Sequence, residues 1–196
     1  MVLESEERDV TTSIECPVLV TERLVLRPPH PDDIPELAQL ANNRRVAEML
    51  ARMPHPYTEA DAAEFVEAAR SRKLGGCHYA IALSDNGAFI GCAGLDDRSH
   101  GLEIGYWIGE PYWGNGYATE VAQALVDLAF RVTSVERLFV SCRVTNNASR
   151  RVIHKCGFQY AGPGMMDTLV AGRVPVERYQ LDRKAWVSLR SWGARR

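Results

Sequence analysis

The stretch of this sequence best suited to chemistry is the glycine turn Gly114-Asn115-Gly116, which lies between two regular segments. Before it, Leu102–Ile108 alternates apolar residues with others, as a strand does, and after it residues 117–130 carry apolar side chains at helical spacing. A helix N-terminus presents unpaired backbone N–H groups at the positive end of the helix dipole, and glycines let a ligand approach the backbone closely. The stretch therefore predicts a cradle for a phosphate group.

Two other phosphate-binding patterns do not fit this turn. The dinucleotide pattern G-x-G-x-x-G fails because Thr119 stands at its third glycine, and the nucleoside-triphosphate pattern fails because no Gly-Lys-Ser/Thr follows. A plain glycine turn that binds nothing remains the alternative. The turn alone does not decide between this alternative and a phosphate cradle.

Three blocks of the sequence resemble one family. Residues 113–118 (WGNGYA) resemble the Gln/Arg-x-x-Gly-x-Gly/Ala pattern with which the GNAT N-acetyltransferase superfamily binds the pyrophosphate of acetyl-coenzyme A (acetyl-CoA). Residues 146–158 (NNASRRVIHKCGF) resemble the Asn-x-Ala-Ser block of the same superfamily, and residues 21–28 (TERLVLRP) resemble the first strand of its ribosomal-protein-alanine N-acetyltransferase branch. The blocks occur in the expected order, and the resemblance covers residues 19–186.

The resemblance implies an α/β (α+β) fold of the GNAT type, in which about four helices flank a single mixed, mostly antiparallel sheet of six to seven strands. The sequence patterns predict strands near residues 24–26, 77–83, 88–95, 102–108, 137–144, 158–160 and 174–181, and helices near 34–41, 59–73, 117–130 and 148–155. We expect residues 161–164 to be flexible. Residues 1–17 are polar and acidic and predict a mobile tail, which leaves residues 18–190 as the acetyltransferase domain.

The resemblance also implies that acetyl-CoA is the co-substrate and that no metal takes part. Trp113 stands where the superfamily favours Gln or Arg, so one side-chain contact to acetyl-CoA is missing while the backbone amides stay available. The residues expected to bind acetyl-CoA are Trp107, Ile108, Trp113, Gly114, Asn115, Gly116, Tyr117, Ala118, Thr119, Asn146 and Arg151.

Amide formation from a thioester needs a neutral amine, a polarised carbonyl and a stabilised leaving thiolate. The resemblance places Glu103 on the strand that carries the superfamily's catalytic glutamate, so Glu103 is the expected general base, with a strand carboxylate that faces solvent or an arginine as the alternative. A backbone N–H near Trp107 and Ile108 should polarise the carbonyl. Many members use a tyrosine early in a later helix as general acid, but residues 148–155 contain none, and Ser149 is the substitute we expect, with a capping role as the alternative.

The acceptor is expected to be a primary amine, and the branch resemblance favours a peptide or protein N-terminal α-amine, which loses its proton more readily than a lysine. Residues 42–57 should form one wall of its site. Arg44 and Tyr57 are the expected contacts, with Arg45 and His55 as further candidates, and solvated loop groups are the alternative for each. An antibiotic or polyamine acceptor, or a CoA-binding regulatory module without turnover, remains open.

Composition limits the location and the partners. A net charge of −2 disfavours nucleic-acid binding. The five cysteines are odd in number and form no Cys-x-x-Cys pair, which favours a reduced, cytoplasmic protein. No apolar run has the length of a membrane span, so we expect no membrane partner. A homodimer is left open.

Overall fold

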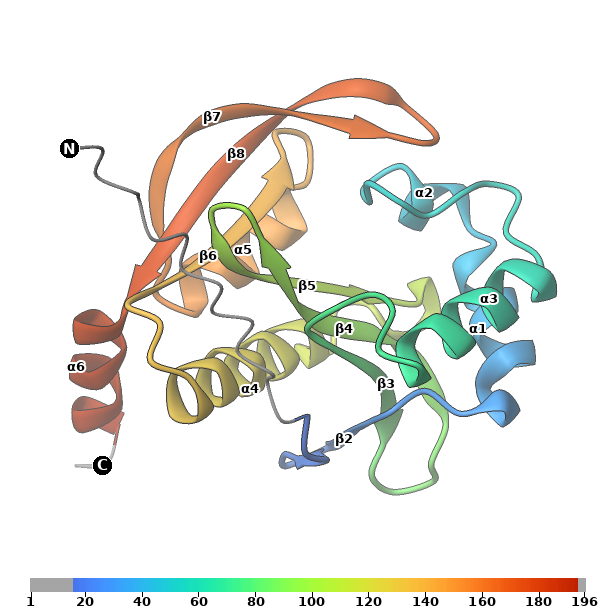
Figure 1. Cartoon of the computed structure of the whole chain (residues 1–196), viewed down its shortest axis with the longest axis horizontal. Helices are drawn as coiled ribbons and strands as arrows, with labels where there is room; N and C mark the ends of the chain where they lie inside the picture. Colours follow the sequence, from blue (N-terminus) through green and yellow to red (C-terminus); the bar gives the residue numbers. More distant parts are fainter. Residues whose placement is uncertain (1–15, 194–196) are drawn as a thin grey trace, which may run out of the picture.

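The computed structural model describes residues 16–193, so nearly all of the predicted N-terminal tail lies outside the described residues. A single eight-stranded sheet organises the chain, in the order β1-β2-β3-β4-β5-β6-β8-β7 (Figure 1). The strands are β1 Leu19–Val20, β2 Leu24–Arg27, β3 Cys77–Leu83, β4 Phe89–Arg98, β5 Gly101–Ile108, β6 Arg137–Arg143, β7 Gln159–Thr168 and β8 Gly172–Asp182.

All neighbouring strands pair antiparallel except β5 and β6, which run parallel. The predicted mixed, mostly antiparallel sheet is therefore confirmed, with one strand more than the upper end of the predicted range. Among the described residues, β5 and β6 pair only where Glu103 lies opposite Phe139, whereas β4 and β5 pair along eight residues. The sheet thus opens between β5 and β6 toward the end of β5.

Six α-helices and two short 3-10 helices accompany the sheet in the described chain. The α-helices are α1 Ile34–Ala41, α2 Arg44–Ala47, α3 Glu59–Arg70, α4 Tyr117–Val132, α5 Asn147–Lys155 and α6 Arg183–Gly193, and the 3-10 helices are η1 Pro31–Asp33 and η2 Glu110–Tyr112. In Figure 1, α4 runs along one side of the sheet while α1 and α3 lie together at the other end of the molecule. No helix among residues 16–193 is long and apolar enough to cross a membrane.

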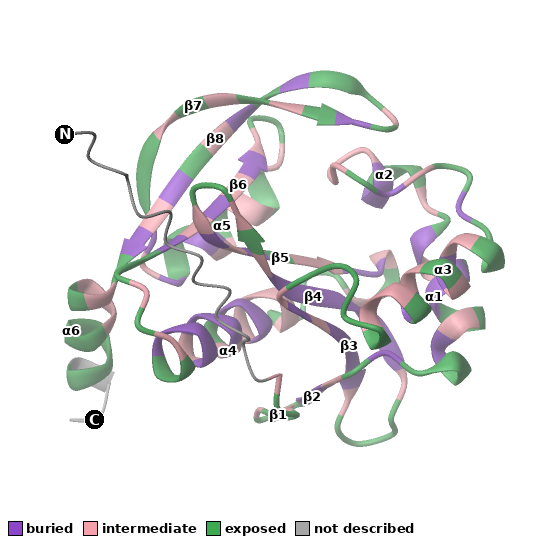
Figure 2. Ribbon diagram, viewed as in Figure 1, coloured by how far each residue is buried: buried purple, intermediate pink, exposed green. Residues whose placement is uncertain are grey.

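Two hydrophobic clusters cover the two faces of the sheet, because side chains alternate along a strand. Tyr79 and Ile81 belong to the cluster that includes the apolar stripe of α4. Their neighbour Ala80 belongs to the other cluster, with side chains of α1 and α3. Buried residues gather along β3, β4 and α4 in Figure 2.

The structure corrects three expectations from the sequence. Residues 161–164, expected to be flexible, lie inside strand β7, because Gly162, Pro163 and Gly164 pair with β8 and only the register shift between Tyr160 and Gly162 interrupts the pairing. The helix α6 was not predicted, and it extends the described structure past residue 190. A capping box of Thr58 and Asp61 begins α3, and the helix ends at Arg70, before the predicted residue 73.

The expectation of reduced cysteines is also wrong for one pair. Cys16 and Cys77 form a disulfide that joins the predicted tail to the start of β3. The remaining cysteines are free and buried, namely Cys92, Cys142 and Cys156. Sequence spacing could not indicate this pairing, since 61 residues separate the two cysteines and only the fold brings them together.

Candidate active site

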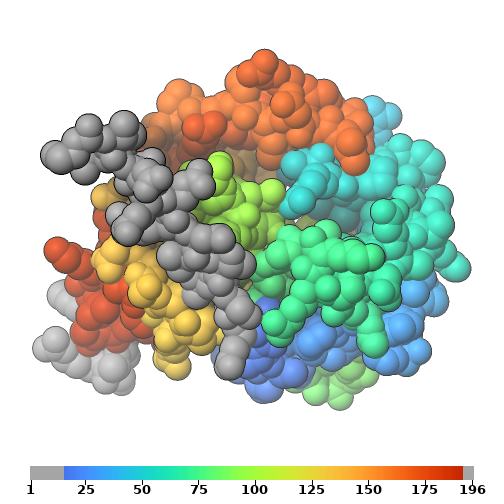
Figure 3. Space-filling model, viewed as in Figure 1, coloured from blue at the N-terminus to red at the C-terminus, as the bar shows by residue number. Residues whose placement is uncertain are grey.

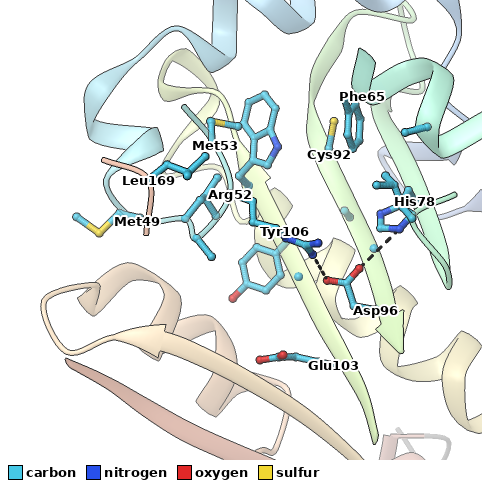
Figure 4. A pocket seen from close by; sticks show the side chains of 18 of the residues that line it. Met49, Arg52, Met53, Phe65, His78, Cys92, Asp96, Glu103, Tyr106 and Leu169 are labelled. Carbon is cyan, nitrogen blue, oxygen red and sulfur yellow. Dashed lines mark hydrogen bonds and ion pairs between the residues drawn. The ribbon is translucent and has the colours of Figure 1, made fainter. Parts of the chain in front are cut away.

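A cavity of about 590 Å³ lies where β4 and β5 face α3 and the loop after α2. Its lining includes Glu103 and Trp107 from one face of β5 and Tyr106 from the other, and its walls include Met49–Pro54 and Phe65. Figure 4 shows these elements converging on one space, with Glu103, Tyr106 and Asp96 reaching into it. A concave site of this size, mostly apolar with a few polar groups, is typical of small-molecule binding.

The roof of the cavity is built by the β7–β8 hairpin and the loop after α2. The N–H of Leu169 donates to the carbonyl of Ala51 at 3.1 Å, and the Arg143 guanidinium on β6 donates to the carbonyl of Glu48. In Figure 3 the hairpin, in orange, meets this loop, in cyan, on the surface. Residues more than 90 positions apart in the sequence are thereby held side by side over the cavity.

The end of β5 directs a backbone N–H into the opening between β5 and β6. The N–H of Gly109 donates to the carbonyl of Ile90 on β4 at 2.8 Å, so the alternation of an antiparallel ladder turns the backbone groups of Ile108 away from β4. The indole N–H of Trp113 donates to the carbonyl of Ile108 at 2.6 Å, in agreement with this direction. The N–H of Trp107 points toward β4 by the same rule. Of the two backbone N–H groups expected to donate to the acyl carbonyl, that of Ile108 therefore points into the opening and that of Trp107 does not.

Glu103 lies in the cavity with a side chain that is 21% exposed. Its carboxylate is 3.7 Å from the guanidinium of Arg98 and 3.8 Å from the imidazole of His100. Glu103 is also the cross-strand neighbour of Asp96, and like charges in that position repel. Arg98 contacts both carboxylates and offsets this repulsion.

The hydroxyl of Ser149 lies 3.1 Å from the hydroxyl of Tyr106 on β5. Sequence analysis missed Tyr106, because it looked for a tyrosine on the helix after β6 and not on β5. Ser149 is not the cap of α5, since Asn146 is the N-cap residue and its side chain accepts from the backbone N–H of Ser149 at 3.0 Å. The Ser149 hydroxyl is thus outside the capping hydrogen bond.

Glu103 and Tyr106 lie on opposite faces of the sheet, because they are three positions apart on one strand. Tyr106 packs against the hydrophobic cluster on the α4 side, and Trp107 packs against the cluster of α1 and α3. Glu103 shares the face of Trp107. A group placed in the opening between β5 and β6 therefore has the carboxylate on one side and the hydroxyl pair of Tyr106 and Ser149 on the other.

The glycine turn has the backbone conformation that the sequence predicts. Gly114 and Gly116 have φ angles of +81° and +82°, and Gly116 is the N-cap of α4 without a side-chain cap. A Cβ on Gly114 would meet no atom within 4 Å, so open space adjoins the turn. The first N–H groups of α4 are therefore accessible to an anion.

An ion pair made by Arg23, the residue before β2, holds this turn against the sheet. Arg23 donates to the Asn115 carbonyl at 2.9 Å and contacts the Glu120 carboxylate at 2.7 Å. Burial acts to raise the pKa of Glu120, but hydrogen bonds from Thr21 and Arg23 outweigh it and lower that pKa. Glu120 therefore stays ionised and serves as an anchor for Arg23.

Of the two arginines on α5, only one is engaged. Arg150 pairs with Glu177 at 2.7 Å and also donates to the Val144 carbonyl. Arg151 is exposed and has no hydrogen-bonding or ion-pairing partner among the described residues. Arg151 is therefore the one with a guanidinium free to meet a ligand.

Of the two residues expected to contact the acceptor, Tyr57 lines the cavity and Arg44 does not. Tyr57 is buried and lines the cavity, and burial raises the pKa of its phenol. Arg44 lies outside the cavity lining, with a guanidinium that is 70% exposed and paired with Glu48 on the same helix. Arg45 instead contacts Glu110 and stacks over the ring of Trp113, 5.1 Å from its centroid.

A charged cluster in the cavity was missed by sequence analysis. The Asp96 carboxylate contacts Arg52 at 3.1 Å and His78 at 3.6 Å (Figure 4). It also contacts Arg98. These residues are scattered over three segments, so only their placement in the fold reveals the cluster. Residues 16–193 hold no group of three or more His, Cys, Asp or Glu side chains placed to bind a metal ion.

Comparison with known proteins identifies the class to which this fold and site belong. A family model described as Acetyltransferase (GNAT) domain matches residues 23–159. The match covers more than half of the sequence, so the chain belongs to the GNAT acetyltransferase family and is an acyltransferase. The resemblance found from three sequence blocks is thereby confirmed.

Individual relatives support the same assignment. The chain is 27% identical over 150 residues to the uncharacterized N-acetyltransferase p20 of Bacillus licheniformis, covering 74% of this chain and 83% of that protein. It is 35% identical over 60 residues to the ribosomal-protein-serine acetyltransferase of Escherichia coli, covering 31% and 34% of the two chains. The second match supports the ribosomal-protein branch predicted from the sequence.

Solved structures share the fold. A GNAT-family acetyltransferase from Bacillus anthracis superposes with a TM-score of 0.76 at 22% identity, over 85% of this chain and 99% of that one. RimL, a ribosomal alpha-N-protein acetyltransferase solved in complex with coenzyme A, superposes with a TM-score of 0.72 at 23% identity, over 86% and 99%. The expected fold class is therefore confirmed.

Proposed function

We propose that this acyltransferase moves an acetyl group from acetyl-CoA to a primary amine, and that the amine is the N-terminal α-amine of a peptide or protein. One observation carries the proposal. The opening between β5 and β6 has Glu103 on one face and the Tyr106–Ser149 hydroxyl pair on the other. Acyl transfer needs a base near the incoming amine and a hydrogen-bond donor near the leaving thiolate, and this arrangement supplies one group for each step.

The glycine turn is suited to the pyrophosphate of acetyl-CoA. Positive φ angles at Gly114 and Gly116 and the uncapped start of α4 leave N–H groups for phosphate oxygens. Arg151 adds a free guanidinium for a further phosphate, and guanidinium groups recognise phosphate well. Acetyl-CoA supplies the acyl group as a thioester that an amine can attack with loss of a thiolate.

Glu103 acts as the general base for the incoming amine. An α-amine has an unperturbed pKa near 8, so a carboxylate acting directly or through a water molecule is sufficient to remove its proton. Arg98 and His100 hold this carboxylate in place through ion contacts. The N–H of Ile108 donates to the carbonyl oxygen of the acyl group, which stabilises the charge that develops there.

Ser149 stabilises the leaving thiolate, and Tyr106 orients Ser149. Burial raises the pKa of the Tyr106 phenol, so it stays protonated. When the Tyr106 phenol donates its hydrogen to Oγ of Ser149, the serine hydrogen is left to point at the sulfur of acetyl-CoA. A thiol near pKa 8.5 leaves readily as the thiolate, so a hydrogen bond suffices and no proton needs to be transferred.

Replacing Tyr106 with phenylalanine is expected to lower kcat about tenfold, the effect of one lost hydrogen bond, with little change in KM for acetyl-CoA. The measurement is a double-mutant cycle with Ser149→Ala. Since the hydroxyls act as a unit, the double variant should be no slower than Ser149→Ala alone. Tyr160→Phe, at an exposed tyrosine on β7, is the control. Fully additive losses would contradict the pairing.

The first test of the function is release of free thiol from acetyl-CoA, measured in parallel with N-terminal peptides and small amines as acceptors. We expect turnover with peptides. Turnover on antibiotics or polyamines alone would overturn the peptide assignment in favour of a small amine. Tight acetyl-CoA binding without turnover on any acceptor would favour a regulatory module. A cytoplasmic location stays a prediction, and a homodimer stays open.

A further inference from the structure

We propose that the acceptor carries a bulky apolar group next to its amine, so that among peptides those with a large apolar first residue are the best substrates. This inference rests on the proposed function and specifies its acceptor. It comes from the composition of the cavity, since neither the family match nor the relatives indicate an apolar first residue.

The part of the cavity away from Glu103 is an apolar wall. Its side chains come from four segments: the loop after α2, α3, the turn before β3 and the β7–β8 hairpin. They are Met49, Leu50, Met53, Phe65, Leu74, Met166 and Leu169. Figure 4 shows Met49, Met53 and Leu169 on one side of the space and Phe65 on another, with Glu103 beyond them.

Some of this wall is exposed to solvent as it stands. Leu169 is 67% exposed and Leu74 is 36% exposed, although both line the cavity. An apolar group that fills the space would remove this surface from water, which is favourable by about 25 cal/mol per Å². Three of the wall residues are methionines, whose flexible side chains adapt to different apolar shapes. We therefore expect tolerance among large apolar groups and discrimination against small or polar ones.

The charges of the cavity do not suit a second amino group. Asp96 is already paired with Arg52, His78 and Arg98. Asp61 accepts hydrogen bonds from Thr58 in the capping box of α3.

Glu64 is the remaining acid of the walls without a hydrogen-bonding or ion-pairing partner among the described residues, and it is exposed. Polyamines and aminoglycosides need several free carboxylates in one pocket. The cavity therefore fits an acceptor with one amine and an apolar substituent.

The test compares peptides that differ only in the first residue, with serine, alanine, leucine, methionine or phenylalanine, and spermidine as a polycationic amine. We expect kcat/KM for leucine, methionine and phenylalanine to exceed that for serine by about tenfold or more, the discrimination that an apolar pocket achieves. Equal or faster turnover on serine or alanine peptides, or on spermidine, would overturn this inference and leave acetyl transfer standing. No turnover on any acceptor would overturn the proposed function and this inference with it.

A variant at the mouth of the cavity tests the role of the apolar wall by changing the protein and not the peptide. Leu169→Asp places a carboxylate in the apolar wall at an exposed site, where folding should not suffer. We expect it to lower kcat/KM for the leucine peptide about fivefold to tenfold and to change the serine peptide little. Val187→Asp, at a half-exposed position on α6, is the matched control. Equal loss on both peptides would contradict a specificity role for the wall.

Discussion

Replacing Glu103 with glutamine is expected to lower kcat by about 100-fold or more, because the amide keeps the size of the side chain and removes its basicity. Affinity for acetyl-CoA should stay unchanged, since Glu103 lies on the opposite face of the sheet from the Tyr106–Ser149 pair and away from the glycine turn. The measurement is steady-state turnover together with calorimetric binding of acetyl-CoA to the same variant.

Asp97→Asn is the control for this substitution, because Asp97 is an exposed carboxylate on the neighbouring strand β4. It should leave turnover within twofold of the unmodified protein. Unchanged turnover in Glu103→Gln would remove the assigned base. A loss of acetyl-CoA affinity equal to the loss of turnover would assign Glu103 to binding instead of proton transfer.

Replacing Gly116 with valine is expected to weaken acetyl-CoA binding about 100-fold, which corresponds to about 2.7 kcal/mol. The φ angle of +82° disfavours any β-branched residue. An added Cβ would lie 3.5 Å from the guanidinium of Arg23, which donates to the Asn115 carbonyl, so we expect the turn to shift away from the geometry that binds phosphate. Losing one or two hydrogen bonds to a charged group, each worth about 1.5–3 kcal/mol, accounts for the size of the effect. The dissociation constant of acetyl-CoA is the quantity to measure.

Gly87→Val is the control that distinguishes the effect of backbone strain on stability from the effect of the substitution on acetyl-CoA binding. Gly87 has a φ of +75° in the turn between β3 and β4, and an added Cβ there meets nothing within 4 Å. Both variants should lower the melting temperature by a similar few degrees, since each introduces about 1–2 kcal/mol of strain. Only Gly116→Val should weaken binding. Equal affinities in the two variants would contradict the phosphate cradle.

The sequence by itself determined the local parts of the site. Alternation in Leu102–Ile108, the two glycines and the apolar spacing after Gly116 specify a strand, a turn and a helix, because each depends on residues close together in the chain. The positive φ angles of Gly114 and Gly116 agree with this prediction. The family blocks added Glu103 and Ser149 as candidates, although the role of each is untested.

Long-range contacts were decided only by the tertiary structure. The Tyr106–Ser149 hydroxyl pair joins residues 43 positions apart, and the Ala51–Leu169 hydrogen bond that roofs the cavity joins more distant ones. The disulfide between Cys16 and Cys77 is a third case. Such pairs depend on strand order and register, which local propensities do not specify.

The charges of the cavity also depend partly on the sequence and partly on the tertiary structure. In the sequence, nothing distinguishes the adjacent acids Asp96 and Asp97. The alternation of β4 places only Asp96 in the cavity, opposite Glu103. There its carboxylate contacts Arg52 and Arg98. Whether an acid is free to bind a substrate depends on which cations the fold brings to it. The sequence therefore determined that the chain is a GNAT acyltransferase, and the folded sheet decided the shape and charge of the site that receives the amine.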